Sequence, residues 1–91
     1  MLDVSNYYEQ LVIDQLAHLA ESEEEPLSQT FLEDVACLAL NSLPPCYVRH
    51  LVDKSASMSE HDHEHMRATV EKAIKRAMVQ VRLRPHEGRG A

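Results

Sequence analysis

The feature that most constrains the fold of this chain is an apolar segment, from Leu32 to His50, that a double proline interrupts. At about 100° per residue, the apolar side chains before the prolines span about 200° of a helix surface. They are Phe31, Leu32, Val35, Ala36, Leu38, Ala39, Leu40 and Leu43. A surface helix of a soluble domain needs an apolar stripe only somewhat wider than about 100°. The segment therefore predicts a helix that is covered on two sides, and in so short a chain it points to a second subunit, a homodimer.

The length of the chain fits a single domain over residues 1–91 with a small core. Hydrophobic residues make up 44% and charged residues 26%, which suits a globular fold and argues against general disorder. The only two glycines lie near the end, so the body has little turn material. We predict an all-α fold of three main helices and a proline-rich connector, with residues 87–91 as a frayed tail.

Cysteine use and the start of the chain indicate a cytoplasmic protein. Cys37 falls in the middle of a helix and Cys46 follows the prolines, so the two form no disulfide framework. The first residues are acidic and no signal-peptide run follows them. No apolar run is long enough to cross a bilayer, and we expect no membrane contact.

Charge is distributed unevenly along the chain. Residues 1–34 contain nine acidic residues and no Lys or Arg, whereas residues 66–91 contain seven Lys and Arg against two acids. We expect these regions to pair within or between subunits. Although the last helix has a basic face, the chain as a whole is acidic and lacks a helix-turn-helix signature. A nucleic-acid polymer is therefore not an expected partner.

Apolar periodicity predicts a first helix over about residues 7–21 and a long last helix that extends to about Arg84. The first begins at Asn6, which is spaced from Glu9 as in a capping box. The last begins with a similar spacing over residues 57–60. Pro85 ends it.

The middle helix is predicted to begin near Thr30, which has the capping-box spacing to Glu33. It ends by residue 43, because Pro44 disfavours helical geometry in the residue before it. Residues 44–50 form an extended or tightly turned connector, and residues 51–56 a short turn or strand.

A specific resemblance appears at residues 39–48, ALNSLPPCYV, with Asp34 five residues upstream. This string resembles the late competence development protein ComFB family. Residues 6–9, NYYE, fit the opening helix of that family. The residues that fit its closing helix are Arg67, Val70, Ala73, Ala77, Val81, Pro85 and His86. The resemblance covers almost the whole chain, and its LPP-x-Y-V core is distinctive.

The resemblance implies a small, mostly helical cytoplasmic protein that tends to dimerise. Some relatives act as receptors for the second messengers cyclic di-GMP and cyclic di-AMP. The family name links it to competence, and relatives connect it to motility and surface behaviour.

This chain departs from some members in one respect. Those members carry a cysteine cluster, which holds structural zinc, around the start of the middle helix. The corresponding residues 23–30 contain no cysteine, and Cys37 and Cys46 alone cannot complete a tetrahedral sulfur site. We expect no zinc of that type and no other cofactor.

The connector over residues 44–50 is the first candidate for ligand binding. Its prolines lower the entropy cost of ordering a binding loop. Tyr47 offers a flat face on which a purine can stack. Arg49 can bind a phosphate or a guanine edge, and His50 adds a donor. The alternative is structural: Tyr47 fills the core and Arg49 pairs with the acidic first helix.

Other candidates lie on the helices. Asp34 and Asn41 share one narrow strip of the middle helix with Cys37, where they could contact a base edge. Alternatively, Asn41 caps the helix end and Asp34 bonds to a neighbouring backbone group. Arg67 and Arg84 of the last helix could offset phosphate charge.

The histidine run of residues 61–65 admits two interpretations. His61 and His65 are four residues apart and could share a metal on a helix. His63 points about 160° away from His61 on a regular helix, so the three cannot converge. An exposed polar first turn is the alternative. The sequence has no nucleophile motif, no phosphate-binding glycine loop and no paired carboxylates with an evident pocket, so we do not expect an enzyme.

By resemblance, the expected function is reception of cyclic di-GMP or cyclic di-AMP by a homodimer that signals to an unidentified downstream protein. The sequence does not choose between guanine and adenine. The alternatives are a ligand-free protein adaptor and a metal-binding module built on the histidine run.

Overall fold

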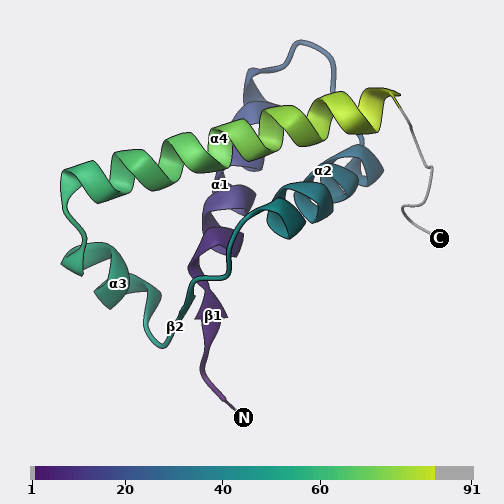
Figure 1. Cartoon of the computed structure of the whole chain (residues 1–91). Helices are drawn as coiled ribbons and strands as arrows, with labels where there is room; N and C mark the ends of the chain where they lie inside the picture. The colour runs from purple at the N-terminus through teal and green to yellow at the C-terminus, as the bar shows by residue number, and fades with distance from the viewer. Residues whose placement is uncertain (1, 84–91) are drawn as a thin grey trace.

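Four helices and one two-stranded sheet make up residues 2–83, the part of the chain that the structure, a computed structural model, describes (Figure 1). In chain order they are β1 (Ser5–Asn6), α1 (Tyr7–Ser22), α2 (Gln29–Ser42), β2 (Tyr47–Val48), α3 (Leu51–Ser57) and α4 (Glu60–Leu83). Helices account for most of these residues, which confirms the predicted all-α class. The predicted tail over residues 87–91 lies outside the described residues.

Helix α1 matches its predicted bounds to within one residue. Asn6 has an extended backbone, and its Oδ1 accepts a hydrogen bond of 3.1 Å from the Tyr8 backbone N–H. This bond satisfies one of the N–H groups that every helix start leaves without an intrahelical partner. Behind the cap, Tyr7 and Tyr8 turn into the core, so the NYYE motif places both aromatic rings inside the molecule.

Helix α2 begins one residue before the predicted start, and its cap is a different residue. Ser28, not Thr30, caps the helix, because the Ser28 Oγ accepts a hydrogen bond of 3.0 Å from the Phe31 backbone N–H. Thr30 already lies inside the first turn. The helix ends at Ser42, and Leu43 is extended (φ −95°, ψ 147°), as expected for a residue that precedes a proline.

The segment after the double proline forms strand β2, which pairs antiparallel with β1. Ser5 lies opposite Val48, and Asn6 lies opposite Tyr47. This ribbon joins the two ends of a segment about 40 residues long and fixes the start of α1 beside the end of the connector. Two-residue strands carry no alternation pattern, so the sequence did not predict the sheet.

The prediction of a short turn or strand over residues 51–56 is wrong, because these residues form helix α3. Its first turn is closed by a hydrogen bond of 3.0 Å from the Lys54 backbone N–H to the His50 carbonyl. Helix α3 has no buried residue. It is attached to α4 where His63 Nε2 lies 2.9 Å from the Ser55 carbonyl oxygen.

Helix α4 begins with a capping box, but not at the predicted pair of residues 57 and 60. The Ser59 Oγ accepts from the Asp62 backbone N–H, and the Asp62 Oδ2 accepts from the Ser59 backbone N–H, each over 3.1 Å. Ser57 is engaged elsewhere, because its hydroxyl donates to the Lys54 carbonyl at the end of α3. None of the helices within residues 2–83, α4 included, combines the length and apolarity that crossing a bilayer requires.

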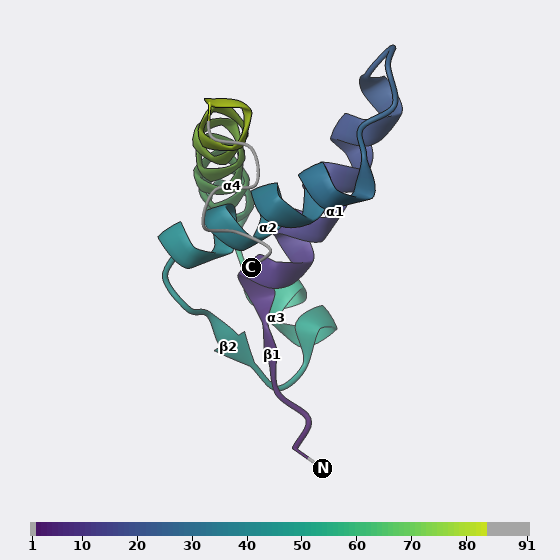
Figure 2. The same ribbon diagram turned by 90° about the vertical axis from the view of Figure 1, so that its right-hand side faces the viewer.

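The core lies where α1, α2 and α4 pack against one another. Figure 1 shows α4 running across both shorter helices, and Figure 2, which views α4 nearly end-on, shows α2 and α1 on the same side of it. Val12, Val35 and Val70, one from each helix, are almost completely buried at the centre. The other members of this cluster are Tyr8, Leu16, Ala39, Ala73, Ile74, Ala77, Met78 and Val81.

Helices of the same subunit cover much of the wide apolar surface of α2. Helices α1 and α4 pack against it from two sides, which supplies the two neighbours that the sequence pattern requires. Val35 and Ala39 are fully buried between them. The flank formed by Leu32, Ala36 and Leu40 remains only half-buried. The width of the apolar arc alone therefore does not demand a second subunit.

Candidate functional site

Two hydrogen bonds join the start of α1 to the connector at Cys46, and a third caps the helix at Asn6. The Asn6 Oδ1 accepts from the Tyr8 backbone N–H over 3.1 Å and from the Cys46 backbone N–H over 3.2 Å. The Tyr7 backbone N–H in turn donates to the Cys46 carbonyl over 2.7 Å. The two segments that carry the sequence resemblance, NYYE and LPPCYV, thus meet in space. Their bonds hold the backbone of the β1–β2 ribbon, from which Tyr47 projects.

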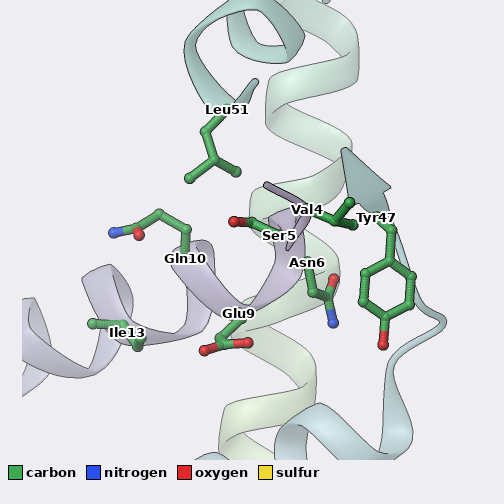
Figure 3. Close-up of a pocket in the computed structure, with 8 residues that line it drawn as sticks. All are labelled: Val4, Ser5, Asn6, Glu9, Gln10, Ile13, Tyr47 and Leu51. Carbon is green, nitrogen blue, oxygen red and sulfur yellow. The ribbon is translucent and has the colours of Figure 1, made fainter. Parts of the chain in front are cut away.

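A hollow of about 320 Å³ lies beside Tyr47, and we call it the Tyr47 hollow (Figure 3). Its lining consists of Val4, Ser5, Asn6, Glu9, Gln10, Ile13, Tyr47 and Leu51. The Tyr47 side chain is 69% exposed, so the alternative that this ring fills the core is wrong. Glu9 is the one charged residue of the lining. The hollow therefore combines an aromatic face, apolar side chains, uncharged polar side chains and a single carboxylate.

A second hollow, of about 360 Å³, lies beside Arg49, and we call it the Arg49 hollow. Its lining consists of Asp3, Ser5, Arg49, His50, Leu51, Val52 and Asp53. Ser5 and Leu51 line both hollows, which makes the two hollows neighbours. Arg49 is exposed, and the acids in its hollow belong to the N-terminal segment and α3, not to α1. The guanidinium is thus accessible to an anion, with two carboxylates close by.

The Tyr8 phenol is buried next to the start of the ribbon's sequence, in the core cluster. Burial raises the pKa of Tyr8 above its ordinary value, and the nearby Cys46 thiol raises it further when ionised. A neutral phenol suits the core, because burying a charge is costly. Tyr8 therefore belongs to the core, while the Tyr47 ring faces solvent.

The predicted site residues divide into two groups. Tyr47, Arg49 and His50 come together at the two neighbouring hollows. Asp34 is half-buried on α2, and Asn41 is exposed near its end; neither belongs to either lining.

The two predicted arginines of the last helix add nothing to these linings. Arg67 is exposed on α4, outside both hollows, and Arg84 lies outside the described residues. At the end of α2 it is Ser42, not Asn41, whose side chain bonds back to the helix, through a 2.8 Å bond to the Ala39 carbonyl.

Sequence reasoning missed the residues that the N-terminal segment contributes. Ser5 and Glu9 reach the hollows because β1 pairs with β2. Of these, only Glu9 belongs to the NYYE motif, which the resemblance singled out together with LPPCYV.

The three side chains of the histidine run do not converge on one point. His63 reaches toward α3 and the Ser55 carbonyl, while His61 and His65 are exposed. Within residues 2–83, no group of three or more His, Cys, Asp or Glu side chains is arranged to hold a metal ion.

Comparison with known proteins identifies the family. A search of curated proteins and a search of solved structures each returned no match. The family profile described as "Late competence development protein ComFB" matches residues 5–85, which include both segments that meet at Asn6. Because this match spans most of the sequence and contains the hydrogen-bonded junction, the chain belongs to the late competence development protein ComFB family.

Proposed function

We propose that this late competence-associated protein is a receptor for a cyclic dinucleotide, cyclic di-GMP or cyclic di-AMP, and that it signals to a protein partner in the control of competence or motility. The observation that carries the proposal is the exposed Tyr47 ring on a hydrogen-bonded ribbon, with Arg49 two residues further along. Binding by some relatives, which the family resemblance implies, supports the same choice of ligand.

The ribbon offers the two kinds of contact that a nucleotide needs. An exposed aromatic ring can stack on a nucleobase, and such stacking contributes about 1–3 kcal/mol per base. The Arg49 guanidinium can form charge-assisted hydrogen bonds to a phosphate. Because hydrogen bonds already fix the backbone at Asn6 and Cys46, ligand binding costs little backbone ordering entropy there.

A homodimer suits this ligand better than one subunit does. A cyclic dinucleotide has two bases and two phosphates related by a twofold axis, whereas each subunit has one Tyr47 and one Arg49. Two copies around the same axis would present both residues twice. The half-buried flank of α2, made of Leu32, Ala36 and Leu40, provides apolar surface for such a contact.

Calorimetric titration of the full chain with cyclic di-GMP and with cyclic di-AMP tests the proposal, together with sedimentation velocity for the oligomeric state. We expect micromolar binding of at least one ligand, with one ligand per two chains, and a dimer by sedimentation. If neither ligand binds a verified dimer at micromolar concentration, the receptor proposal is wrong and the protein is a ligand-free adaptor.

A further inference from the structure

The Tyr47 hollow has the size of a site for a single nucleobase. Ligand pockets generally enclose about 300–1,000 Å³. The Tyr47 hollow, at about 320 Å³, lies at the lower end of this range, which suits one nucleobase better than a whole cyclic dinucleotide. One base stacked on Tyr47, with the sugar and phosphate passing toward the neighbouring Arg49 hollow, fits the two adjoining linings. The polar groups of the Tyr47 hollow then face the edge of that base.

The Asn6 amide presents a donor to this hollow. Two backbone N–H groups donate to its Oδ1, and this fixes which branch of the amide is the oxygen. The Nδ2 group points away from these donors and remains a hydrogen-bond donor for a molecule in the hollow. In Figure 3, the Asn6 amide lies between the Glu9 carboxylate and the Tyr47 ring.

The Glu9 carboxylate presents two acceptors beside that donor. Its side chain is exposed and carries the only charge of the lining. An ionised carboxylate can accept two parallel hydrogen bonds, and bonds to a charged partner are stronger than neutral ones.

We propose that the Tyr47 hollow selects guanine over adenine, with Glu9 as the specificity-determining residue; this inference rests on the proposed function. The Watson–Crick edge of guanine has two adjacent donors, N1–H and the 2-amino group, which match the two oxygens of Glu9. Its O6 acceptor matches the Nδ2 group of Asn6. Adenine has a single amino donor on that edge, so it can engage only one oxygen of Glu9. Losing one hydrogen bond to a charged group weakens binding about tenfold or more.

Calorimetry with three ligands tests this selection on the unmodified chain. The third ligand is cyclic di-IMP, whose bases are guanines without the 2-amino group. We expect cyclic di-GMP to bind at least about tenfold more tightly than cyclic di-AMP, with cyclic di-IMP between them.

A matched pair of variants assigns the selection to Glu9. Glu9→Gln keeps the size of the side chain but replaces one acceptor with a donor, so the guanine 2-amino group loses its partner. We expect cyclic di-GMP and cyclic di-IMP to become equal, and the preference over cyclic di-AMP to fall to about threefold or less. Glu21→Gln makes the same charge change on the same helix outside the hollow and should leave the preference unchanged. Circular dichroism verifies that both variants are folded.

The possible outcomes separate the two proposals. If no cyclic dinucleotide binds, the receptor function fails and the inference fails with it. If cyclic di-GMP and cyclic di-AMP bind equally, or cyclic di-AMP binds more tightly, the receptor stands and the selection of guanine is overturned. If the unmodified chain prefers cyclic di-GMP but Glu9→Gln keeps the full preference, Glu9 does not determine it and the inference is overturned.

Discussion

The Asn6 side chain and the Cys46 backbone N–H are joined by a hydrogen bond of 3.2 Å, although 40 residues separate them in the chain. The same Asn6 oxygen caps α1 through the Tyr8 N–H. One amide oxygen therefore performs a local task, starting a helix, and a long-range task, holding the connector that carries Tyr47. The family motifs NYYE and LPPCYV are linked by this atom, so stability and site geometry depend on the same residue.

Replacing Asn6 with alanine should lower the free energy of unfolding by about 2 kcal/mol. Loss of a helix cap costs about 1 kcal/mol, and leaving the partly buried Cys46 N–H without its partner adds a similar amount. Urea unfolding followed by circular dichroism measures the change.

Ser28→Ala is the matched control for Asn6→Ala. Ser28 caps α2 through the Phe31 N–H but makes no long-range bond of this kind, so we expect a loss of about 1 kcal/mol. Asn6→Asp, which keeps an acceptor oxygen, should retain most of the stability. If Asn6→Ala is no more destabilising than Ser28→Ala, the bond to Cys46 contributes nothing to folding.

Val35 is fully buried where α2 contacts its two neighbours, and Val35→Ala tests the packing of that centre. Removing two methyl groups from a closed site costs their transfer free energy and leaves a cavity, so we expect a loss of about 2 kcal/mol. Val52→Ala on α3, where the side chain is 80% exposed, should change stability by less than about 0.5 kcal/mol. Equal losses in the two variants would contradict the assigned core.

The three long helices were predictable because each buries one face. Apolar periodicity persists through α1, α2 and α4, since all three contribute to one core. Helix α3 buries no residue and therefore leaves no periodic pattern in the sequence. The predicted cap of α4 was wrong because several serines precede this helix. Spacing alone does not reveal that the Ser57 hydroxyl is already bonded to the Lys54 carbonyl.

The candidate site was predictable only on one side of the ribbon. Tyr47, Arg49 and His50 are consecutive or nearly so, and a connector stiffened by prolines suggests binding. Glu9 and Ser5 belong to a distant segment, and they reach the same place through the pairing of two-residue strands. Such pairing depends on tertiary packing and leaves no local signal.

The start of α4 should lose stability at low pH through Asp62. The hydrogen bond from the Ser59 backbone N–H, together with that from the Ser59 side chain, lowers the pKa of Asp62 below its ordinary value. The folded chain thus favours the ionised carboxylate, and this contribution is present above about pH 4, the ordinary range of Asp. It is lost as the pH falls through the lowered pKa.

Unfolding experiments at several pH values below 5 can detect this contribution. The difference in stability between the unmodified chain and Asp62→Ala should shrink as the pH decreases. Glu64→Ala, which removes an exposed acid of the same helix, serves as the control. A difference that stays constant down to pH 2 would contradict the role of the Asp62 carboxylate.

Arg49→Ala should weaken binding of the cyclic dinucleotide at least tenfold without a large change in melting temperature. Arg49 is exposed, so its removal costs little packing, whereas a charge-assisted contact to phosphate is lost. Arg76→Ala, at an exposed arginine on α4 outside both hollows, should leave the affinity unchanged. A sharp drop in melting temperature for Arg49→Ala would instead indicate a structural role for Arg49.

Tyr47→Ala should separate binding from stability most clearly. The ring is 69% exposed, so its removal should change the free energy of unfolding by less than about 0.5 kcal/mol. Loss of a stacked base should weaken cyclic dinucleotide binding about tenfold to a hundredfold.

Tyr8→Ala provides the opposite case, because that ring is 8% exposed and belongs to the core cluster. We expect it to cost about 3 kcal/mol or more of stability. Calorimetric titration and urea unfolding on both variants give the comparison. Within residues 2–83, no other exposed aromatic ring lines either hollow. If Tyr47→Ala binds the nucleotide as tightly as the unmodified chain, the ribbon is therefore not part of the binding site.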